Sequence, residues 1–253
     1  MQLMGLHLTP IPTGAWALTP LRFGFILVVT VAFAGVGHLV RGVSRSGAIA
    51  GGVVCFVLFA CVGPGAFAAL FSLFAVTWLA TRMGRARKLR LGTAERGEGR
   101  TASQVLANLG IATLCAAMFA WRGSPYWLLA MAAALAEAAA DTVSSECGQA
   151  CSDSAHLITT FERVPAGTDG GITWVGILAG AGGALLVSAV CLLAGVPAQW
   201  VWIPAVSGVL GMLADSYLGA WVERRGRLGN DGVNFTSTAI ATAFAGGLLR
   251  LVG

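Results

Sequence analysis

The sequence predicts an all-α integral membrane protein, a polytopic bundle of about eight membrane-spanning helices (range roughly six to eight). Hydrophobic residues make up 57% of the 253-residue chain and charged residues only 11%, and the mean hydropathy is +0.79. A soluble core does not need that share of apolar side chains, so the composition is typical of multi-pass membrane proteins.

The expected spans follow one another closely along the chain. They cover about residues 22–41, 47–63, 66–81, 102–121, 126–143, 172–194, 200–221 and 233–251, each near the ~20 apolar residues that cross a bilayer. Gly63-Pro64-Gly65, between the short second and third spans, is typical of a tight turn. Residues 1–20 lack a basic segment and a small-residue cleavage site, so we expect an N-terminal tail rather than a signal peptide.

Residues 21–253 are expected to form a single transmembrane domain with two unlike halves. All eleven acidic residues lie between Glu95 and Asp231, so the first three spans contain none. We therefore interpret 21–81 as apolar scaffold spans, 82–101 as a basic cytoplasmic loop, and 102–253 as the spans and loops that carry function.

Basic residues are concentrated on one side of the membrane in this topology. Thirteen of the 16 lie in alternate connections: two at 41–45, seven at 82–100, one at Arg163 and three at 224–227. Because cytoplasmic loops are enriched in Lys and Arg, we expect these connections in the cytosol and both termini outside, in the cytoplasmic membrane of a prokaryote. The net charge of +5 then reflects topology and anionic lipid headgroups, and nucleic acid is not expected as a partner.

Polar side chains of the second half fall near the predicted cytoplasmic ends of their spans. An ionisable group inside a span costs several kcal/mol unless it is paired or hydrated, so it marks a functional site by default. Asp141 and Asp215 lie close to these ends and are predicted to line one shallow pocket. Glu137 lies one helical turn before Asp141 on the same face.

The carboxylates of this half suit a hard cation. Asp141 and Glu146 bracket Ser144 and Ser145, and Asp215 comes from another span. Mg²⁺ is usually held by one or two carboxylates together with substrate phosphates, so Asp141, Glu146 and Asp215 are predicted metal ligands. The alternative is that Asp141 and Asp215 form ion pairs with loop arginines.

A glycine-rich turn precedes the sixth span. It contains Gly167, Thr168, Gly170 and Gly171, and Thr159-Thr160 comes before it. Such a turn leading into a helix N-terminus presents backbone N–H groups to an anion, which predicts phosphate binding. The turn is neither a Walker A sequence nor a dinucleotide fingerprint, and glycines also form turns without any ligand.

Further candidates lie at the starts of the fourth and eighth spans. Asn230 is expected to cap the eighth span, while Asn234 and Ser237, three residues apart, share a helix face. Arg100 ends the basic loop, with Asn108 two helical turns further on. Because guanidinium forks match phosphate oxygens, Arg100 is a predicted phosphate-binding residue.

Zinc and hydrolase sites are not expected. Cys147, Cys151 and His156 supply only three of the four ligands of a tetrahedral zinc site. A Ser-His-Asp hydrolase would need a partnered histidine, and none can be located in the pattern.

Five motifs occur in order along the chain: Ser103–Asn108, Asp141–Glu146, Thr159–Gly170, Asp215–Ala220 and Asn230–Asn234. Together, over roughly residues 35–250, they resemble a family of multi-pass membrane proteins long known as a domain of unknown function. Its best characterised members are the phytyl-phosphate kinases of plants and cyanobacteria.

The resemblance implies a kinase that transfers a phosphoryl group from a nucleoside triphosphate, such as CTP, to an isoprenyl monophosphate in the bilayer, giving the diphosphate. Asp141, Glu146 and Asp215 would hold Mg²⁺ and the nucleotide. The residues that would contact or orient phosphates are Arg100, Asn108, Ser145, Thr159, Thr160, Gly167, Thr168, Gly170, Gly171, Asn230, Asn234 and Ser237. A phosphate nucleophile is already anionic, so positioning and charge neutralisation suffice without a histidine base.

Two other functions remain open from the residues. A small-molecule or lipid transporter could also use buried carboxylates and glycine-rich helices, but it needs polar groups further along the membrane, where these spans are apolar. A non-catalytic assembly protein would explain glycine-rich faces, but not acids and amides gathered at one membrane face. The oligomeric state is not predicted.

Overall fold

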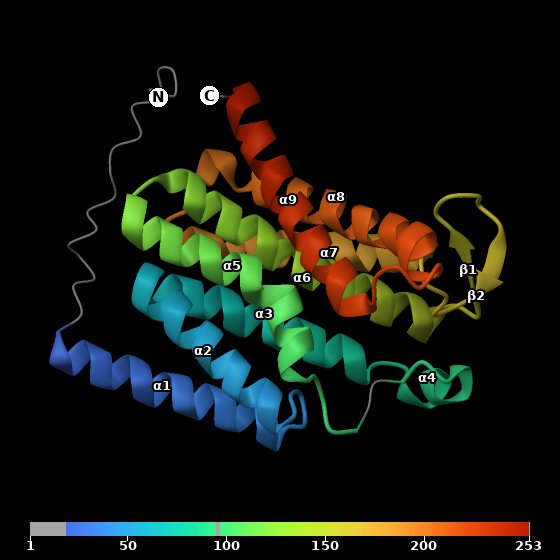
Figure 1. The fold of residues 1–253 in the computed structure, drawn as a ribbon, viewed down its shortest axis with the longest axis horizontal. Coiled ribbons are helices and arrows are strands. Elements are labelled where there is room, and N and C mark those ends of the chain that lie inside the picture. The colour runs from blue at the N-terminus through green and yellow to red at the C-terminus, as the bar shows by residue number, and fades with distance from the viewer. Residues whose placement is uncertain (1–18, 95–96, 253) are drawn as a thin grey trace.

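The computed structural model describes residues 19–94 and 97–252, which form a helical bundle with eight membrane-spanning candidates (Figure 1). The long helices are α1 (Pro20–Leu39), α2 (Arg45–Val62), α3 (Pro64–Arg82), α5 (Ala102–Arg122), α6 (Pro125–Cys151), α7 (Trp174–Val190), α8 (Trp202–Leu218) and α9 (Asn230–Val252). The predicted all-α polytopic fold is confirmed. The predicted N-terminal tail lies almost wholly outside the described residues.

Local sequence signals account for the helix boundaries. Pro20, Pro64 and Pro125 occupy first-turn positions of α1, α3 and α6, where a missing N–H is tolerated. Thr101 caps α5 in a reciprocal capping box with Gln104. The tight turn expected between the second and third spans is present, since α2 ends at Val62 and α3 begins at Pro64.

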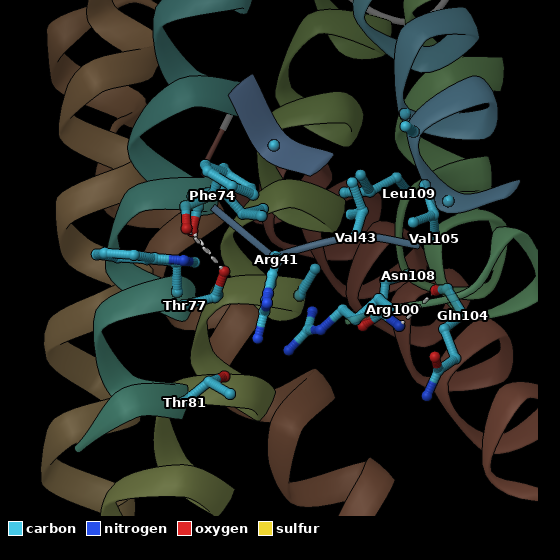
Figure 2. Close-up of a pocket in the computed structure, with 18 of the residues that line it drawn as sticks. Arg41, Val43, Phe74, Thr77, Thr81, Arg100, Gln104, Val105, Asn108 and Leu109 are labelled. Atoms are coloured by element: carbon cyan, nitrogen blue, oxygen red, sulfur yellow. Dashed lines mark hydrogen bonds between the residues drawn. The ribbon is translucent and has the colours of Figure 1, made fainter. Parts of the chain in front are cut away.

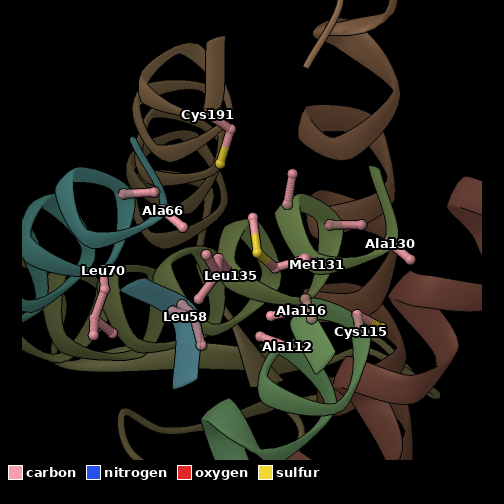
Figure 3. Packing of buried hydrophobic residues seen from close by; sticks show 14 of the residues in the cluster. Leu58, Ala66, Leu70, Ala112, Cys115, Ala116, Ala130, Met131, Leu135 and Cys191 are labelled. Carbon is pink, nitrogen blue, oxygen red and sulfur yellow. The ribbon is translucent and has the colours of Figure 1, made fainter. Parts of the chain in front are cut away.

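Helix α6 is the centre of the bundle and packs against α3, α5, α7, α8 and α9. Its long alanine-rich run is almost completely buried, because small side chains let neighbouring helices approach closely. Figure 3 shows Met131 and Leu135 of α6 among side chains from neighbouring helices, including Leu58 and Ala112. At about 1.5 Å per residue its 27 residues extend about 40 Å, more than the ~30 Å hydrocarbon core of a bilayer.

Glycines let α7 and α8 approach α6. A Cβ atom on Gly180 of α7 would lie 2.7 Å from the carbonyl oxygen of Ala140, and one on Gly211 of α8 would lie 2.5 Å from Cγ of Glu137. Neither gap admits a methyl group. This close packing brings α7 and α8 against the carboxylate-bearing face of α6.

One end of the bundle collects the elements outside the spans, and we call it the loop face. It carries α4 (Arg85–Leu91) and a small antiparallel sheet, ordered β2-β1-β3, of β1 (Ser154–Leu157), β2 (Arg163–Pro165) and β3 (Gly171–Ile172). In Figure 1, α4, β1 and β2 lie together at this end. Strands of two to four residues leave little pattern to read, so the sheet was not expected from the sequence.

Candidate functional site

A pocket of about 130 Å³ opens at the loop face between α6, the 166–173 loop and the end of α8. We call it the acidic pocket, because four carboxylates line it and, among the described residues, no Lys or Arg does. The carboxylates are Asp141, Asp169, Asp215 and Glu223. The other lining residues that were predicted for the site are Ser145, Gly167, Thr168, Gly170, Gly171 and Asn230.

Asp141 and Asp215 are brought together by the packing of α6 against α8. Their carboxyl groups lie within hydrogen-bonding reach of each other, and Arg100 acts electrostatically on Asp141. Two ionised carboxylates at this distance repel each other. A bound cation would relieve this repulsion.

A chain of amide and hydroxyl groups holds Asp215 from the other side. Ser237 of α9 donates a 3.0 Å hydrogen bond to Oδ2 of Asp215. With the Asn234 amide oriented to fit its neighbours, its nitrogen donates to the same oxygen at 3.2 Å and its oxygen accepts from Nδ2 of Asn108 at 3.0 Å. The structure thus brings Asn234 and Ser237 of α9 to Asp215 of α8, and Asn108 of α5 joins them through Asn234.

Glu137 lies beneath the pair, one turn deeper in α6. Its side chain is 1% exposed, and it interacts with Asp141, Asp215 and Ser237. Its Oε1 has no hydrogen-bond partner among the described residues. A further carboxyl group therefore lies one turn behind the pair, as its spacing from Asp141 predicted, but it does not line the acidic pocket.

The glycine turn closes the pocket against η4 (Gly219–Glu223), the irregular continuation of α8. Gly170 has φ of +75°, and a Cβ there would lie 2.5 Å from the backbone nitrogen of Ala220. The turn is internally bonded, since the Gly171 N–H donates to the Thr168 carbonyl at 2.8 Å. Only glycine fits position 170, because a side chain would meet both strain and a clash.

Glu146 was expected to join Asp141 and Asp215, but the structure places it elsewhere. We expected the fifth span to end near residue 143, whereas α6 stays helical to Cys151. Five residues along a helix turn the side chain by about 140°, so Glu146 points away from the acidic pocket. It pairs with Lys88 at 2.5 Å and accepts from Thr81 at 3.0 Å.

Thr159 and Thr160 were expected to cradle phosphate, but they lie outside the lining of the acidic pocket. They form the exposed turn between β1 and β2, and Oγ1 of Thr160 accepts from the backbone N–H of Glu162 at 3.3 Å. The unexpected hairpin carries them away from the pocket, while the following glycines return to it.

Arg100 reaches the same region from the end of the basic loop, next to Asp141. It donates a 3.2 Å hydrogen bond to Oγ1 of Thr142, the residue after Asp141, and it lines a separate cavity between α3 and α5 (Figure 2). Arg100 therefore lies at the boundary between that cavity and the acidic pocket.

Glu223 and Gln149 also line the pocket and were not predicted from the sequence. Glu223 lies eight residues after Asp215, about two helical turns, so the spacing Asp215–Gly219–Glu223 could have identified it. Gln149 lies eight residues after Asp141 in the same way. Its nitrogen donates to Ser145 at 2.9 Å, while its Oε1 is buried without a partner among the described residues.

No group of three or more His, Cys, Asp or Glu side chains in residues 19–94 and 97–252 is arranged to hold a metal ion by itself. The pocket does hold a pair of neighbouring carboxylates, Asp141 and Asp215. Mg²⁺ commonly binds through one or two carboxylates and completes its coordination with phosphates and water, so the donor set fits this ion together with a phosphate ligand.

Comparison with known proteins places the chain among integral membrane proteins of one family. The family described as "Integral membrane protein DUF92" matches residues 28–242. An uncharacterised membrane protein of Methanocaldococcus jannaschii, MJ0933, is 35% identical over 200 residues, which cover 79% of this chain and 83% of that protein.

Relatives also occur in photosynthetic organisms. The chloroplastic protein VTE6 of Arabidopsis thaliana is 27% identical over 217 residues, covering 82% of this chain and 65% of that protein. The uncharacterised membrane protein sll0875 of Synechocystis is 28% identical over 202 residues, covering 78% of each chain. No solved structure matches. The family match spans most of the chain, and the protein therefore belongs to the DUF92 family of integral membrane proteins.

Proposed function

We propose that this protein is a membrane-embedded kinase that transfers the terminal phosphoryl group of a nucleoside triphosphate to an isoprenyl monophosphate, giving the diphosphate. The observation that carries the proposal is the Asp141–Asp215 carboxylate pair, held by Asn234 and Ser237 and facing a glycine turn. Membership of the family and the motif resemblance to phytyl-phosphate kinases support it.

Magnesium fits the donors of the acidic pocket. Asp141 and Asp215 would hold the ion, and the unpartnered Oε1 of Gln149 offers a further oxygen for the ion or its water. Bound there, Mg²⁺ would neutralise charge on the transferring phosphates. Without a cation, four carboxylates would repel a nucleotide polyphosphate, so nucleotide binding is expected to require the metal.

The residues of the chain would position donor and acceptor. Backbone N–H groups of the 167–171 turn and the amide of Asn230 would bind the nucleotide phosphates. An oxygen of the acceptor monophosphate forms a bond to the terminal phosphorus, the bond from that phosphorus to the bridging oxygen breaks, and the nucleoside diphosphate leaves. Arg100, bonded to Thr142 beside Asp141, would stabilise the added negative charge.

The loop face is proposed to face the cytosol, where nucleotide is available. The basic residues of the expected cytoplasmic connections lie at this end, together with the acidic pocket, as the positive-inside rule requires. Accessibility of a cysteine introduced at exposed Thr160, measured in intact cells with a membrane-impermeant maleimide, tests this orientation. Labelling only after permeabilisation is expected.

The direct test is product formation by the purified protein in nanodiscs. Nucleoside triphosphates with Mg²⁺ would be incubated with phytyl, farnesyl or geranylgeranyl monophosphate, and the diphosphates detected by mass spectrometry. Asp215→Asn is expected to lower the rate by about 100-fold or more, as loss of a group that stabilises transition-state charge does. Absence of diphosphate across the whole panel would overturn the proposal.

Asp153→Asn is the matched control. Asp153 lies on the same loop face but outside the acidic pocket, and its side chain is exposed and paired with Arg87. The Arg87 guanidinium hydrogen-bonds to it and holds the pKa of this carboxyl below its usual value. Its replacement is expected to leave the rate of diphosphate formation unchanged.

The alternative function, a lipid transporter, has its own test. Lipid flux in liposomes that persists in Asp215→Asn would favour a transporter over a kinase.

A further inference from the structure

A second cavity, of about 150 Å³, lies among α1, α2, α3 and α5, and touches α6 at Ala138, three residues before Asp141 (Figure 2). We call it the basic-ended cavity. Its inner walls are apolar and include Phe33, Leu70, Leu73, Phe74 and Leu109, whereas its loop-face end carries arginines. Among the described residues, no Asp or Glu lines it.

The cavity is elongated along α3. Leu70, Phe74, Thr77 and Arg82 line it in turn, and the twelve residues from Leu70 to Arg82 extend about 18 Å along the helix axis. The lining changes from apolar to basic in that direction. Phe33 of α1 closes one side through an edge contact with Phe74, at 5.5 Å between ring centroids.

The arginines at the loop-face end differ in how they are used. Arg82 donates a 2.6 Å hydrogen bond to the Val40 carbonyl and lies over the Trp78 ring. Arg41 and Arg85 make no hydrogen bond or ion pair through their side chains within the described residues. Two positive charges without a partner in a partly enclosed space favour an anion.

Arg41 also occupies an unusual backbone position. It follows α1 with φ of +56°, a left-handed conformation in which glycine is preferred after a helix. In Figure 2 the side chains of Arg41 and Arg100 extend into the same part of the cavity from different segments. An arginine kept where glycine would be more stable is typical of a functional residue.

The basic end of this cavity lies next to the acidic pocket. Arg100 lines the cavity and bonds to Thr142, while Asn108 lines it and bonds through Asn234 to Asp215. A phosphate held beside Arg100 would therefore lie close to the carboxylate pair.

We propose that the basic-ended cavity binds the acceptor as a single-chain lipid with a phosphate head. The apolar chain lies along α3 toward Leu70, and the phosphate lies between Arg41, Arg85 and Arg100. The identity of the acceptor rests on the proposed function, but its binding requires neither nucleotide nor metal. The cavity is thus an acceptor site separate from the nucleotide site.

The test is equilibrium binding of farnesyl monophosphate to the protein in nanodiscs, without nucleotide or Mg²⁺, followed by tryptophan fluorescence because Trp78 lines the cavity. Gly51→Leu is the blocking variant. Gly51 lines the cavity and a Cβ there meets no atom within 4 Å, so leucine fits without a clash and occupies the space of the chain.

Gly35→Leu is the matched control, because Gly35 is an exposed helical glycine, also with no atom within 4 Å of its Cβ, and it does not line the cavity. Gly51→Leu is expected to weaken binding by about tenfold or more, and Gly35→Leu by less than about twofold. Thermal unfolding of both variants verifies that they are folded.

Two further ligands separate the parts of the site. Farnesol lacks the phosphate and inorganic phosphate lacks the chain, so each should bind at least about tenfold more weakly than farnesyl monophosphate if both ends contribute. Equal binding of farnesyl monophosphate to wild type and Gly51→Leu would overturn the proposal, even if diphosphate is formed. If Gly51→Leu blocks binding but no diphosphate is formed by the wild type, the lipid-binding site is supported and the proposed kinase activity is excluded.

Discussion

Lys88 on α4 and Glu146 on α6 form a 2.5 Å ion pair with side chains only 1% and 15% exposed. The Lys88 ammonium also donates to the carbonyls of Ala80 and Thr81, at 3.2 and 2.6 Å, so its three donors are all used. The pair joins the basic loop to the ends of α3 and α6, which gives Glu146 a structural role.

Lys88→Met should destabilise the fold, because the mostly buried charge of Glu146 would lose its cation and keep only the Thr81 hydroxyl. Breaking such a pair typically costs about 3–5 kcal/mol, and replacing both residues, as Lys88→Met with Glu146→Leu, should recover part of the loss. Thermal unfolding in detergent measures this. If Glu146→Gln instead abolished metal binding at unchanged melting temperature, Glu146 would be a ligand after all.

Ser237→Ala should lower kcat/KM while leaving the protein folded. It removes a donor to Asp215, and a hydrogen bond to a charged group contributes about 1.5–3 kcal/mol, equivalent to roughly 10–150-fold in rate. Thr242→Ala on the same helix is the control, since its hydroxyl bonds to the Thr238 carbonyl and to no other group in the part of the chain that the structure describes. Equal effects of the two changes would contradict the role given to Ser237.

Gly170→Ala should raise the KM for nucleotide and lower stability. Alanine at a φ of +75° is strained by about 1 kcal/mol, and its methyl group would push the turn away from Ala220. Gly182→Ala, at an exposed helical glycine with open space around it, should stabilise the helix slightly. An unchanged KM in Gly170→Ala would exclude the turn from nucleotide binding.

Arg41→Gly should separate stability from function. Glycine relieves a left-handed residue of about 1 kcal/mol of strain, so the melting temperature should rise while the KM for the acceptor increases. Phe161→Gly is matched, since Phe161 has φ of +58° but lies exposed on the hairpin; it should raise stability alone. If Arg41→Gly raises the melting temperature but leaves the KM for the acceptor unchanged, Arg41 does not bind the acceptor.

The sequence predicted the eight spans because hydropathy and length determine them with little help from tertiary contacts. It also predicted the meeting of Asp215, Asn234 and Ser237, because each lies near the same end of its span. Glu146 was expected beside Asp141 and Asp215 because the apolar run ends near residue 143, whereas α6 continues to Cys151 and turns Glu146 toward Lys88. Lys88 was used only as one of the basic residues that predict orientation in the membrane, because nothing in the local sequence indicates that this loop lysine is buried.

The basic-ended cavity was not predicted, because its walls come from residues far apart in sequence. Phe33, Gly51 and Leu70 look like ordinary lipid-facing residues of three scaffold spans, and only the packed structure shows the space between them. The sequence therefore predicted residues of the acidic pocket but not the basic-ended cavity.

The most direct test of the central claim is metal binding at the Asp141–Asp215 pair. Electron paramagnetic resonance can titrate Mn²⁺, in place of Mg²⁺, into nanodisc-embedded protein with a non-hydrolysable nucleoside triphosphate. The account predicts nucleotide-dependent Mn²⁺ binding that Asp141→Asn and Asp215→Asn each abolish and Glu146→Gln retains. Nucleotide-dependent binding that survives in the double variant Asp141→Asn/Asp215→Asn would contradict it.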